Sequence, residues 1–517
     1  MIPGKGQAAA GEGDRGPSVR GALASLSLSI LMASLGTSIA NVGLPTLAQA
    51  FSASFQEVQW IVLAYLLAIT TLIVSVGRLG DLTGRRRLLL AGIFLFTAAS
   101  ILCGVAPTLW TLTAARAVQG VGAAIMMALA LAFVSETVPK AKTGSAMGLL
   151  ATMSAIGTAL GPSLGGLLIS GLSWRAIFLI NVPLGTLTLL LAHRYLPVDR
   201  RVPENERTGF DNLGTLLLAL TLAAYTLAVT IGRGSFGQLN IALLLAAAFG
   251  VGLFAFAETR TTSPLVRLTT FRDPLLSASL VMSMLVSTVM MATLVVGPFY
   301  LSRALDLDAA LFGLVLSIGP LVAALTGLPA GRLADRFGAQ RMTIVGLIGL
   351  AAGSVALSEI PTTLGIPGYI VPIVVITAGY SIFQTANNAT VMTDVHPDQR
   401  GVISGILNLS RNLGLITGAS VMGAVFAFAS GASDIKTAHP DAVATGMRVT
   451  FLIAAILILV ALAITVGSLA LASHKRRQAG SSNCRATQQD RTAGGQTHPA
   501  GRASSASATA SSGRDPR

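Results

Sequence analysis

The chain has 517 residues, of which 53% are hydrophobic and only 11% are charged. Soluble proteins carry about 25% charged residues, so this composition excludes a soluble enzyme, a fibrous protein and a disordered chain, and it indicates that lipid covers most of the surface. The formal net charge of +14 comes from basic residues scattered between apolar runs or placed in the tails. This distribution indicates a positive cytoplasmic side and argues against a nucleic-acid partner.

Fourteen apolar runs are long enough to cross a bilayer, which takes about 20 residues. Each should be an α-helix, because lipid offers no partner for unpaired backbone groups. The runs cover residues 21–44, 57–77, 88–106, 109–135, 144–169, 174–195, 212–232, 239–258, 275–299, 309–330, 342–360, 367–391, 401–429 and 447–472. The first run is too long for a signal-peptide core and no cleavage site follows it, so we interpret it as a retained helix.

Lysine and arginine predict the orientation. With the N-terminus in the cytoplasm, 20 of the 35 basic residues lie in cytoplasmic segments, 5 lie outside, 2 lie within runs and 8 lie in the tails. The positive-inside rule therefore predicts cytoplasmic termini. We expect the membrane to be a bacterial-type inner (plasma) membrane. We expect disordered tails at 1–18 and 473–517, because neither can bury enough apolar surface to offset its ordering entropy.

Two loops repeat each other. The segment Gly77–Arg87 reads GRLGDLTGRRR and Gly331–Arg341 reads GRLADRFGAQR. A second correspondence links SETVPKAKTGSAMG at Ser135–Gly148 with TDVHPDQRGVISG at Thr393–Gly405, where an acid, a proline, a basic residue and a glycine recur in order. The sequence therefore predicts an all-α membrane protein with an N-terminal six-helix bundle at 19–195, a cytoplasmic linker with two inserted helices at 196–274, and a C-terminal six-helix bundle at 275–472. Parallel halves of this kind place a binding site between them, near the bilayer midplane.

The repeated loop resembles the cytoplasmic signature of the major facilitator superfamily. Three further segments resemble motifs of this superfamily. LTAARAVQGVGAA at Leu112–Ala124 resembles its helix-4 motif with a membrane Arg, and GTALGPSLGG at Gly157–Gly166 resembles the helix-5 motif typical of its exporters. LGTSIANVGLP at Leu35–Pro45 resembles the helix-1 motif of its 14-span drug:proton antiporter branch, which the count of fourteen runs also fits. The resemblance implies a secondary transporter that exports drug-like or toxic small molecules by alternating access in exchange for protons. A nutrient or metabolite importer of the same superfamily and a non-transporting membrane sensor are the alternatives.

The resemblance also assigns groups of residues. The predicted conformational latch consists of Gly77, Asp81, Gly84, Arg85 and Arg86 with Gly331, Asp335, Arg336 and Gly338; the exporter motif consists of Gly157, Gly161, Pro162, Gly165 and Gly166. Asp81 is expected just before the third helix, where a negative charge favours a helix N-terminus, with Arg85, Arg86 and Arg87 able to pair with it or with lipid phosphates. The alternative is an ordinary capped cytoplasmic loop.

Polar residues inside the runs predict the transport pathway. They are Asn41, Tyr65, Arg116, Gln119, Gln384, Asn388, Asn408 and Arg411, with Trp60 as a further candidate. A charge inside a membrane helix is expensive unless it faces protein or water, which makes such residues functional by default. For Arg116 the alternative is a set of structural hydrogen bonds to neighbouring carbonyls. For the polar stripe at Gln384 and Asn388 the alternative is a set of hydrogen bonds between helices.

No acid lies near the middle of a run, and Gly36 stands where the first motif of that branch usually has an Asp. A pathway with two arginines and no carboxylate should repel a permanent cation, so we expect a neutral, zwitterionic or anionic substrate. Asp81, Glu136 and Asp394 are the candidate proton carriers, with the proton gradient as the energy source; uncoupled transport is the alternative. No nucleotide-binding motif, cofactor or metal site is expected, nor is enzyme activity. The expected partners are the substrate and the bilayer, and the protein is expected to be a monomer.

Overall fold

The computed structural model describes residues 19–53, 55–199, 211–230, 237–261, 264–305, 307, 309–393, 395–396, 399–431 and 439–493, with side chains up to residue 468. All regular structure in these ranges is helical. The first bundle contains α1 (Val19–Ala50), α2 (Phe55–Thr83), α3 (Arg85–Val105), α4 (Leu109–Thr137), η1 (Lys140–Lys142), α5 (Thr143–Gly171), α6 (Ala176–Leu179) and α7 (Asn181–Tyr195). The inserted segment contains α8 (Asn212–Thr230), α9 (Gln238–Arg260) and η3 (Leu268–Arg272). The second bundle contains α10 (Pro274–Phe299), η4 (Tyr300–Ala304), α11 (Ala309–Phe337), α12 (Ala339–Glu359), η5 (Thr362–Leu364), α13 (Gly365–Thr393), α14 (Arg400–Ser430) and α15 (Pro440–Ala493).

Fourteen segments of the described chain are long and apolar enough to cross a membrane, which confirms the predicted number. The sixth is broken into α6 and α7 at Ile180. Pro183 explains the break, because a proline has no N–H to donate and its ring clashes with the carbonyl four residues earlier, that of Leu179. Most other span ends fall within a few residues of the predicted ends, but the second and tenth spans end later, at Thr83 and Phe337, and the fourteenth begins earlier, at Pro440.

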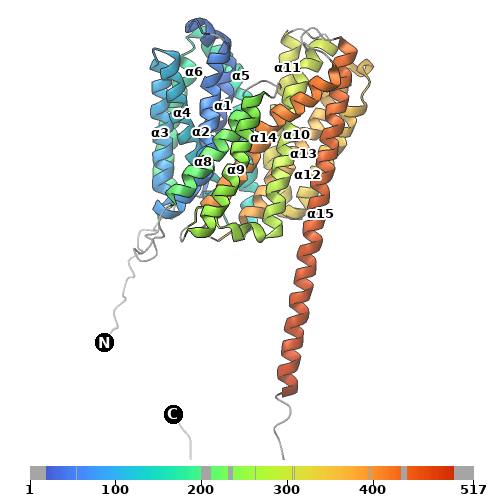
Figure 1. Cartoon of the computed structure of the whole chain (residues 1–517). Coiled ribbons are helices and arrows are strands. Elements are labelled where there is room, and N and C mark those ends of the chain that lie inside the picture. The colour runs from blue at the N-terminus through green and yellow to red at the C-terminus, as the bar shows by residue number, and fades with distance from the viewer. Residues whose placement is uncertain are drawn as a thin grey trace, which may run out of the picture. The chain divides into compact units, whose positions relative to one another are not determined.

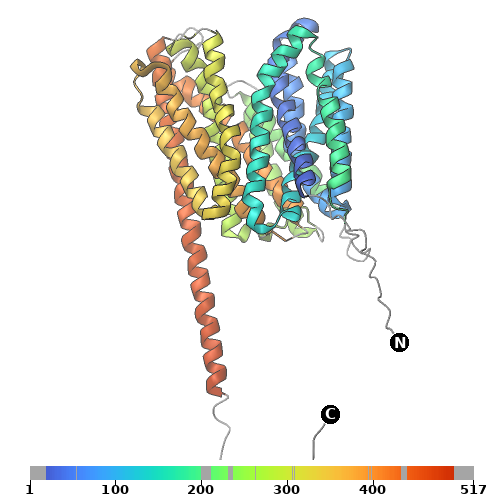
Figure 2. The ribbon, with the colours of Figure 1, turned by 180° about the vertical axis from the view of Figure 1, so that it is seen from behind.

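The helices up to Val466 pack as two bundles of the same design (Figures 1 and 2). In the first bundle α1 packs on α5 and α7, and α2 and α3 pack on α4. In the second bundle α10 packs on α14, and α11 and α12 pack on α13. The bundles meet where α5 crosses α11 and where α2 crosses α14, which are equivalent pairs in the two copies.

The inserted helices α8 and α9 form an antiparallel pair, and α8 packs on α2 and α14. The hydroxyl groups of Tyr225 and Thr417 form a hydrogen bond, and Ser420 Oγ donates to the carbonyl of Val229 at 2.6 Å. The insertion therefore contacts one of the two places where the bundles meet.

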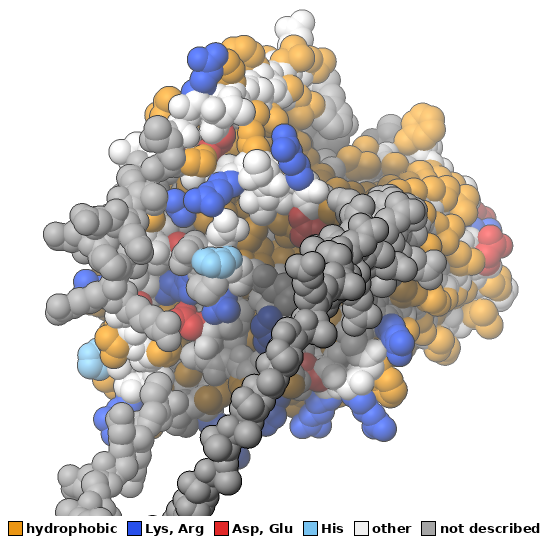
Figure 3. Space-filling view, turned by 90° about the horizontal axis from the view of Figure 1, so that it is seen from below, with side chains coloured by type: hydrophobic (Ala, Val, Ile, Leu, Met, Phe, Trp, Pro, Cys, Tyr) orange, Lys and Arg blue, Asp and Glu red, His pale blue; other side chains and the backbone are white. Residues whose placement is uncertain are grey.

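Apolar side chains cover the outside of the helices, as expected for contact with lipid. Phe428, Phe249 and Leu167 are at least 70% exposed. Figure 3 shows lysine and arginine side chains spread over the face seen from below, with hydrophobic side chains at its rim.

The last helix extends further than the sequence analysis predicts. The fourteenth span is Pro440–Ser468, and the helical backbone of α15 continues to Ala493, where we expected a disordered tail from residue 473. Adding residues to an existing helix avoids the cost of nucleation, and this stretch contains Ala, Arg, Lys and Gln, which favour helix. The rest of that tail and the N-terminal tail 1–18 lie outside the described residues.

Candidate functional site

The first contact between the bundles is made by Asp81, at the end of α2. Its carboxylate accepts hydrogen bonds from the backbone N–H groups of Gly401, at 3.0 Å, and Val402, at 3.2 Å, in the first turn of α14. Arg85 donates to the same carboxylate through Nε and Nη2, at 3.0 and 2.7 Å, and through Nη1 to Glu136 of α4 at 3.0 Å. A carboxylate at a helix N-terminus satisfies unpaired N–H groups and interacts favourably with the helix dipole. We call this arrangement the α2–α14 joint.

The second contact repeats the first in the other copy. Asp335, at the end of α11, accepts from the N–H groups of Gly144 and Ser145 at 2.7 and 2.8 Å, in the first turn of α5. Ser145 Oγ also donates to it, at 2.5 Å. We call this arrangement the α5–α11 joint. Each joint pairs the aspartate of a repeated loop with the glycine of the second repeated segment in the other bundle. The two repeated sequences therefore form the two halves of the same contact, which occurs twice.

Glycines allow the helices to approach closely enough at both joints. A Cβ at Gly77 would overlap the carbonyl oxygen of Gly401, and one at Gly331 would overlap that of Gly144. One turn further along, a Cβ at Gly148 would overlap the carbonyl oxygen of Gly327. The carboxylates can reach the N–H groups only because these backbones touch.

The loop glycines have a different role. Gly84 and Gly338 occupy equivalent positions between two helices, with φ of +106° and +91°. Side chains are rarely tolerated in this conformation, so glycine is needed for the turn itself.

One detail of the predicted latch differs from the structure. Asp81 lies at the end of α2 and caps α14, whereas the N-terminus of α3 is capped by Asp199, which accepts from Arg86 N at 2.8 Å and Arg87 N at 3.1 Å. The close crossing at Gly77 brings the Asp81 carboxylate to the N-terminus of α14, while Arg85 at the start of α3 still pairs with it.

The two joints also differ in their basic residues. Arg86 donates to the carbonyl of His193 at 2.5 Å, within its own bundle. Arg336 is exposed, with its guanidinium 5.3 Å from the centre of the Phe337 ring. The position of Arg85 is occupied by Ala339 in the second loop, and Ser145 supplies the extra donor there instead.

Beyond the joints, the same helices pack inside their own bundles. The rest of α5 lies on α1: Cβ atoms at Gly157 and Gly161 would overlap the backbone of Leu31 and the side chain of Ser38, and one at Gly165 would lie 3.0 Å from Ile39. On α14, Cβ atoms at Gly414 and Gly418 would overlap carbonyl oxygens of α10. The tight contacts between bundles therefore lie at the end of the molecule that carries the repeated loops.

Within the exporter motif, Gly166 has no atom within 4 Å of a Cβ position, and the side chain of Pro162 lies outside the described residues.

Arg116 lies in the interior of the first bundle and is fully buried. Its Nε donates to the carbonyl of Ile61 at 3.1 Å, its Nη2 to that of Gly36 at 3.0 Å, and its Nη1 to Gln119 Oε1 at 2.5 Å. Its guanidinium carbon lies 4.1 Å from the centre of the Tyr65 ring. These contacts match the structural alternative considered for Arg116.

The buried charge of Arg116 has no acidic partner among the described residues. Gly36, which stands where the resembled motif usually has an Asp, presents its carbonyl oxygen to Arg116. A Cβ there would lie 3.2 Å from the hydroxyl of Tyr65 and 3.3 Å from Phe96. Tyr65 donates to the carbonyl of Ala33 at 2.8 Å, and Gln119 donates to Ser100 Oγ at 2.7 Å. The first bundle thus holds a positive charge that is neutralised only by dipoles and aromatic faces.

The other predicted pathway residues are divided between the bundles. Asn41 is exposed on α1, and its side chain donates to Thr37 O at 3.2 Å. Gln384 and Asn388 are 9% exposed on α13. Asn408 is buried and donates to Ser404 O at 3.0 Å, and Arg411 is half-buried. Among the described residues, no contact gathers these side chains into one formed site.

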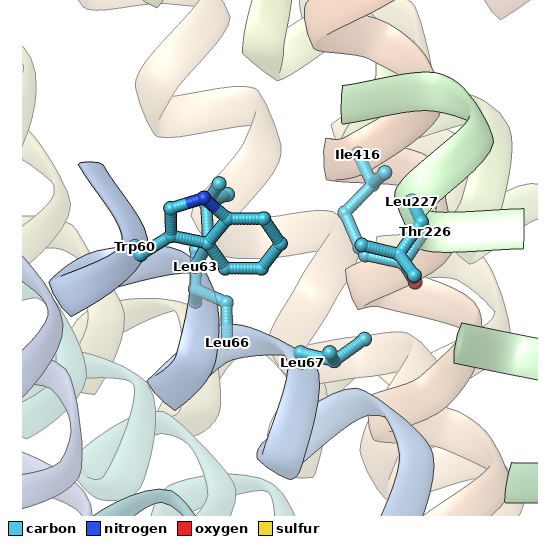
Figure 4. Close-up of a pocket in the computed structure, with 7 residues that line it drawn as sticks. All are labelled: Trp60, Leu63, Leu66, Leu67, Thr226, Leu227 and Ile416. Carbon is cyan, nitrogen blue, oxygen red and sulfur yellow. The ribbon is translucent and has the colours of Figure 1, made fainter. Parts of the chain in front are cut away.

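A small apolar cavity lies between α2, α8 and α14 (Figure 4). Its volume is about 40 Å³, and it is lined by Trp60, Leu63, Leu66, Leu67, Thr226, Leu227 and Ile416. Drug-sized ligands occupy pockets of about 300–1,000 Å³. Trp60, a candidate for the transport pathway, lines this cavity, which is too small to hold such a molecule in this conformation.

Sequence reasoning missed several functional positions. Asp199 follows the sixth run in a charged linker without a motif, and Ser145 resembles any other small residue near a helix start. Gly401 and Gly144 were present in the second repeated segment, but only the folded chain shows that they face the aspartates. Asp394, a candidate proton carrier, lies outside the described residues.

The comparisons with known proteins agree with the fold. The model of the Major Facilitator Superfamily matches residues 26–419 and 300–501. The multidrug resistance protein Stp of Mycobacterium tuberculosis is 34% identical over 411 residues, which are 77% of this chain and 74% of that protein. The riboflavin transporter RibZ of Clostridioides difficile is 28% identical over 439 residues, 85% of this chain and 95% of that protein.

A solved structure has the same arrangement of helices. The proton:xylose symporter XylE superposes with a TM-score of 0.60 at 14% identity, covering 85% of this chain and 94% of that one.

Proposed function

Because the chain belongs to the major facilitator superfamily, we propose that this transporter exports drug-like or toxic small molecules by alternating access. The observation that carries the proposal is the pair of equivalent joints at Asp81 and Asp335, which fasten the two bundles at the end that carries the repeated loops. Breaking both joints would free that end, and the close glycine crossings at Gly77 and Gly331 would separate with them. A relative named for multidrug resistance supports drug-like substrates.

The predicted orientation places the joints on the cytoplasmic side. The repeated loops lie on the side that holds 20 basic residues against 5 on the other, and the positive-inside rule assigns this side to the cytoplasm. The joined state would then be closed to the cytoplasm, and a substrate would enter from there only after the joints open.

The proposed substrate is neutral, zwitterionic or anionic. Arg116 places a buried positive charge in the first bundle without an acidic partner among the described residues, and Arg411 adds a second, half-buried one. Arg116 itself is too buried to touch a substrate in this conformation, so it would act on the substrate only through its electrostatic field. A permanent cation would enter this field at a cost.

Proton exchange is the proposed energy source. Asp81 and Glu136 both bind Arg85 at the α2–α14 joint. Protonation of either acid would weaken its ion pair with Arg85 and favour opening of the joint. A proton taken up there from one side and released on the other would couple the gradient to the conformational cycle.

The test is a resistance and vesicle-transport assay in a host that lacks its own efflux pumps. The wild type should export neutral or anionic toxic compounds better than ethidium, and collapse of the proton gradient should stop export. The variants Asp81→Asn and Arg116→Ala should lose resistance at equal expression. Strong ethidium export by the wild type would contradict the proposed charge preference, and export that ignores the gradient would contradict proton coupling.

Transport of a metabolite is the second candidate function, because RibZ is named a riboflavin transporter and matches along nearly its whole length. Uptake and export of labelled riboflavin in the same vesicles distinguish the two: a metabolite carrier would move riboflavin and confer no resistance.

A further inference from the structure

Two buried acids meet between the inserted helices and take no part in the hydrogen bonds of the joints or of Arg116. Asp211 precedes α8 and is 7% exposed, and Glu258 lies in the last turn of α9 and is 4% exposed. Asp211 Oδ1 accepts from Gly214 N at 2.7 Å, and Glu258 Oε2 accepts from Val266 N at 3.4 Å. Each carboxyl group thus has one oxygen bound to the backbone.

The other two oxygens have no hydrogen-bond partner among the described residues. They are Asp211 Oδ2 and Glu258 Oε1, and both are buried. They lie 2.5 Å and 2.8 Å, respectively, from the position that a Cβ on Gly214 would take, so both turn toward the same point. The missing side chain of Gly214 leaves room for the two carboxyl groups to face each other.

Two buried carboxylates in such proximity cannot both remain ionised cheaply, because each charge loses water and repels the other. A single proton between them would remove one charge and satisfy both free oxygens with one short, charge-assisted hydrogen bond. We propose that Asp211 and Glu258 form a proton-binding site in which one proton is shared between Asp211 Oδ2 and Glu258 Oε1.

Arg78 connects this site to the α2–α14 joint. It follows Gly77 on α2, where α2 crosses α14, is half-buried, and acts electrostatically on Glu258. Asp211 is the other charged group that acts on Glu258. Around Thr417 and Ser420, α14 brings hydroxyl groups to α8 and no charge. Loss of the shared proton to water would leave two negative charges facing Arg78 and so pull on α2 beside the joint.

The second copy of the repeat provides a natural comparison. Arg332 occupies the place of Arg78 on α11, and it is exposed because no inserted helices cover the α5–α11 crossing. The proton site therefore makes the two joints unequal. The link between this proton site and transport rests on the proposed proton-driven export. The shared proton itself does not depend on that proposal.

Infrared spectroscopy of the purified full-length protein tests the site directly. At neutral pH the wild type should show a protonated carboxyl band that shifts in D₂O. Glu258→Gln and Asp211→Asn should each lose this band, because an amide replaces one of the two partners with little change in shape. Asp273→Asn is the matched control: Asp273 also caps a helix, through Leu275 N at 3.0 Å, but it is exposed, so the band should remain.

A second pair of variants tests the link to α2. Removal of positive charge by Arg78→Gln should raise the pH at which the band disappears, and Arg332→Gln should leave it unchanged. A band that is missing from the wild type, or that survives in both amide variants, would overturn the shared proton. In that case thermal stability that depends on Na⁺ or K⁺ at fixed pH would identify a cation site instead.

The results that would contradict the proposed function differ from those that would contradict the shared proton. If the band behaves as expected but a pH gradient does not drive export in vesicles, the site stands and proton-coupled export does not. If export is driven by the gradient but the band is missing, the site is wrong and the export proposal survives.

Discussion

At the scale of single residues, Asp81 and Asp335 carry the contact between the bundles. Replacement of either by Asn removes the charge from a helix N-terminus, an interaction of about 0.3–1 kcal/mol, and up to about 2 kcal/mol in partly buried geometries. A change of 1–2 kcal/mol alters the ratio of two states by about 5–30-fold. We therefore expect Asp81→Asn to shift the molecule toward opening at the loop end, measured as faster labelling of cysteines introduced there.

Asp199→Asn is the control for this experiment. It also removes a carboxylate from a helix N-terminus, but Asp199 caps α3 of its own bundle. It should lower thermal stability and leave the labelling rate unchanged. Equal acceleration by Asp199→Asn and Asp81→Asn would show that the effect comes from a loosened loop and not from the joint.

Gly36 gives a prediction about the charge of the exported substrate. Gly36→Asp would place a carboxylate beside Arg116 and the Tyr65 hydroxyl, which is 3.2 Å from the Cβ position. Pairing with Arg116 would cancel the buried positive charge, so export of ethidium should rise relative to that of an anionic compound, measured in vesicles. Gly36→Asn is the neutral control of similar size, and an equal rise with Asn would rule out charge as the cause.

At the scale of helices, the glycine crossings set how closely the bundles approach. Gly331→Ala should weaken the α5–α11 joint, because its Cβ would overlap the carbonyl oxygen of Gly144, a backbone atom that cannot move aside. Gly319→Ala, on the same helix, is the control, since its Cβ would lie 3.9 Å from the nearest atom. Both proteins should insert and fold, but only Gly331→Ala should reduce transport.

The α1–α5 seam allows a similar comparison within the exporter motif. A Cβ at Gly161 would overlap Ser38 Oγ, whereas Gly166 has open space around it. We expect Gly161→Ala to lower both the thermal stability and the export rate, and Gly166→Ala to change neither. Loss of export by both variants would mean that the motif acts through something other than helix packing.

At the scale of the whole molecule, the sequence predicts the fold well because the bilayer leaves few choices. Length and hydropathy determine the helices, and the repeated loops reveal the duplication. The joints were only half predictable: the aspartates and glycines stood out, but their partners lie about 190 and 320 residues away in the chain. Only packing brings them together.

Arg116 shows the limit of sequence reasoning about sites. A charge in an apolar run indicates a special role, but the pattern does not show whether its partners are carbonyls or a substrate. The pair of Asp211 and Glu258 shows the same limit in residues that do not stand out in the sequence. Both acids fall at helix ends, where carboxylates are common, and only the turn after α9 and the gap at Gly214 bring their free oxygens together.

The most direct test of the account is a pair of distances between the bundles in lipid nanodiscs, measured by electron–electron double resonance. One spin-label pair, Thr83→Cys with Arg341→Cys, reports on the loop end of the bundles. The other, Thr108→Cys with Thr363→Cys, reports on the opposite end, and Cys103 and Cys484 are replaced by Ser in both proteins. The account predicts that a pH change or added substrate lengthens one distance while it shortens the other, and that Asp81→Asn alone lengthens the first. Distances that stay fixed, or that change together in the same direction, would contradict it.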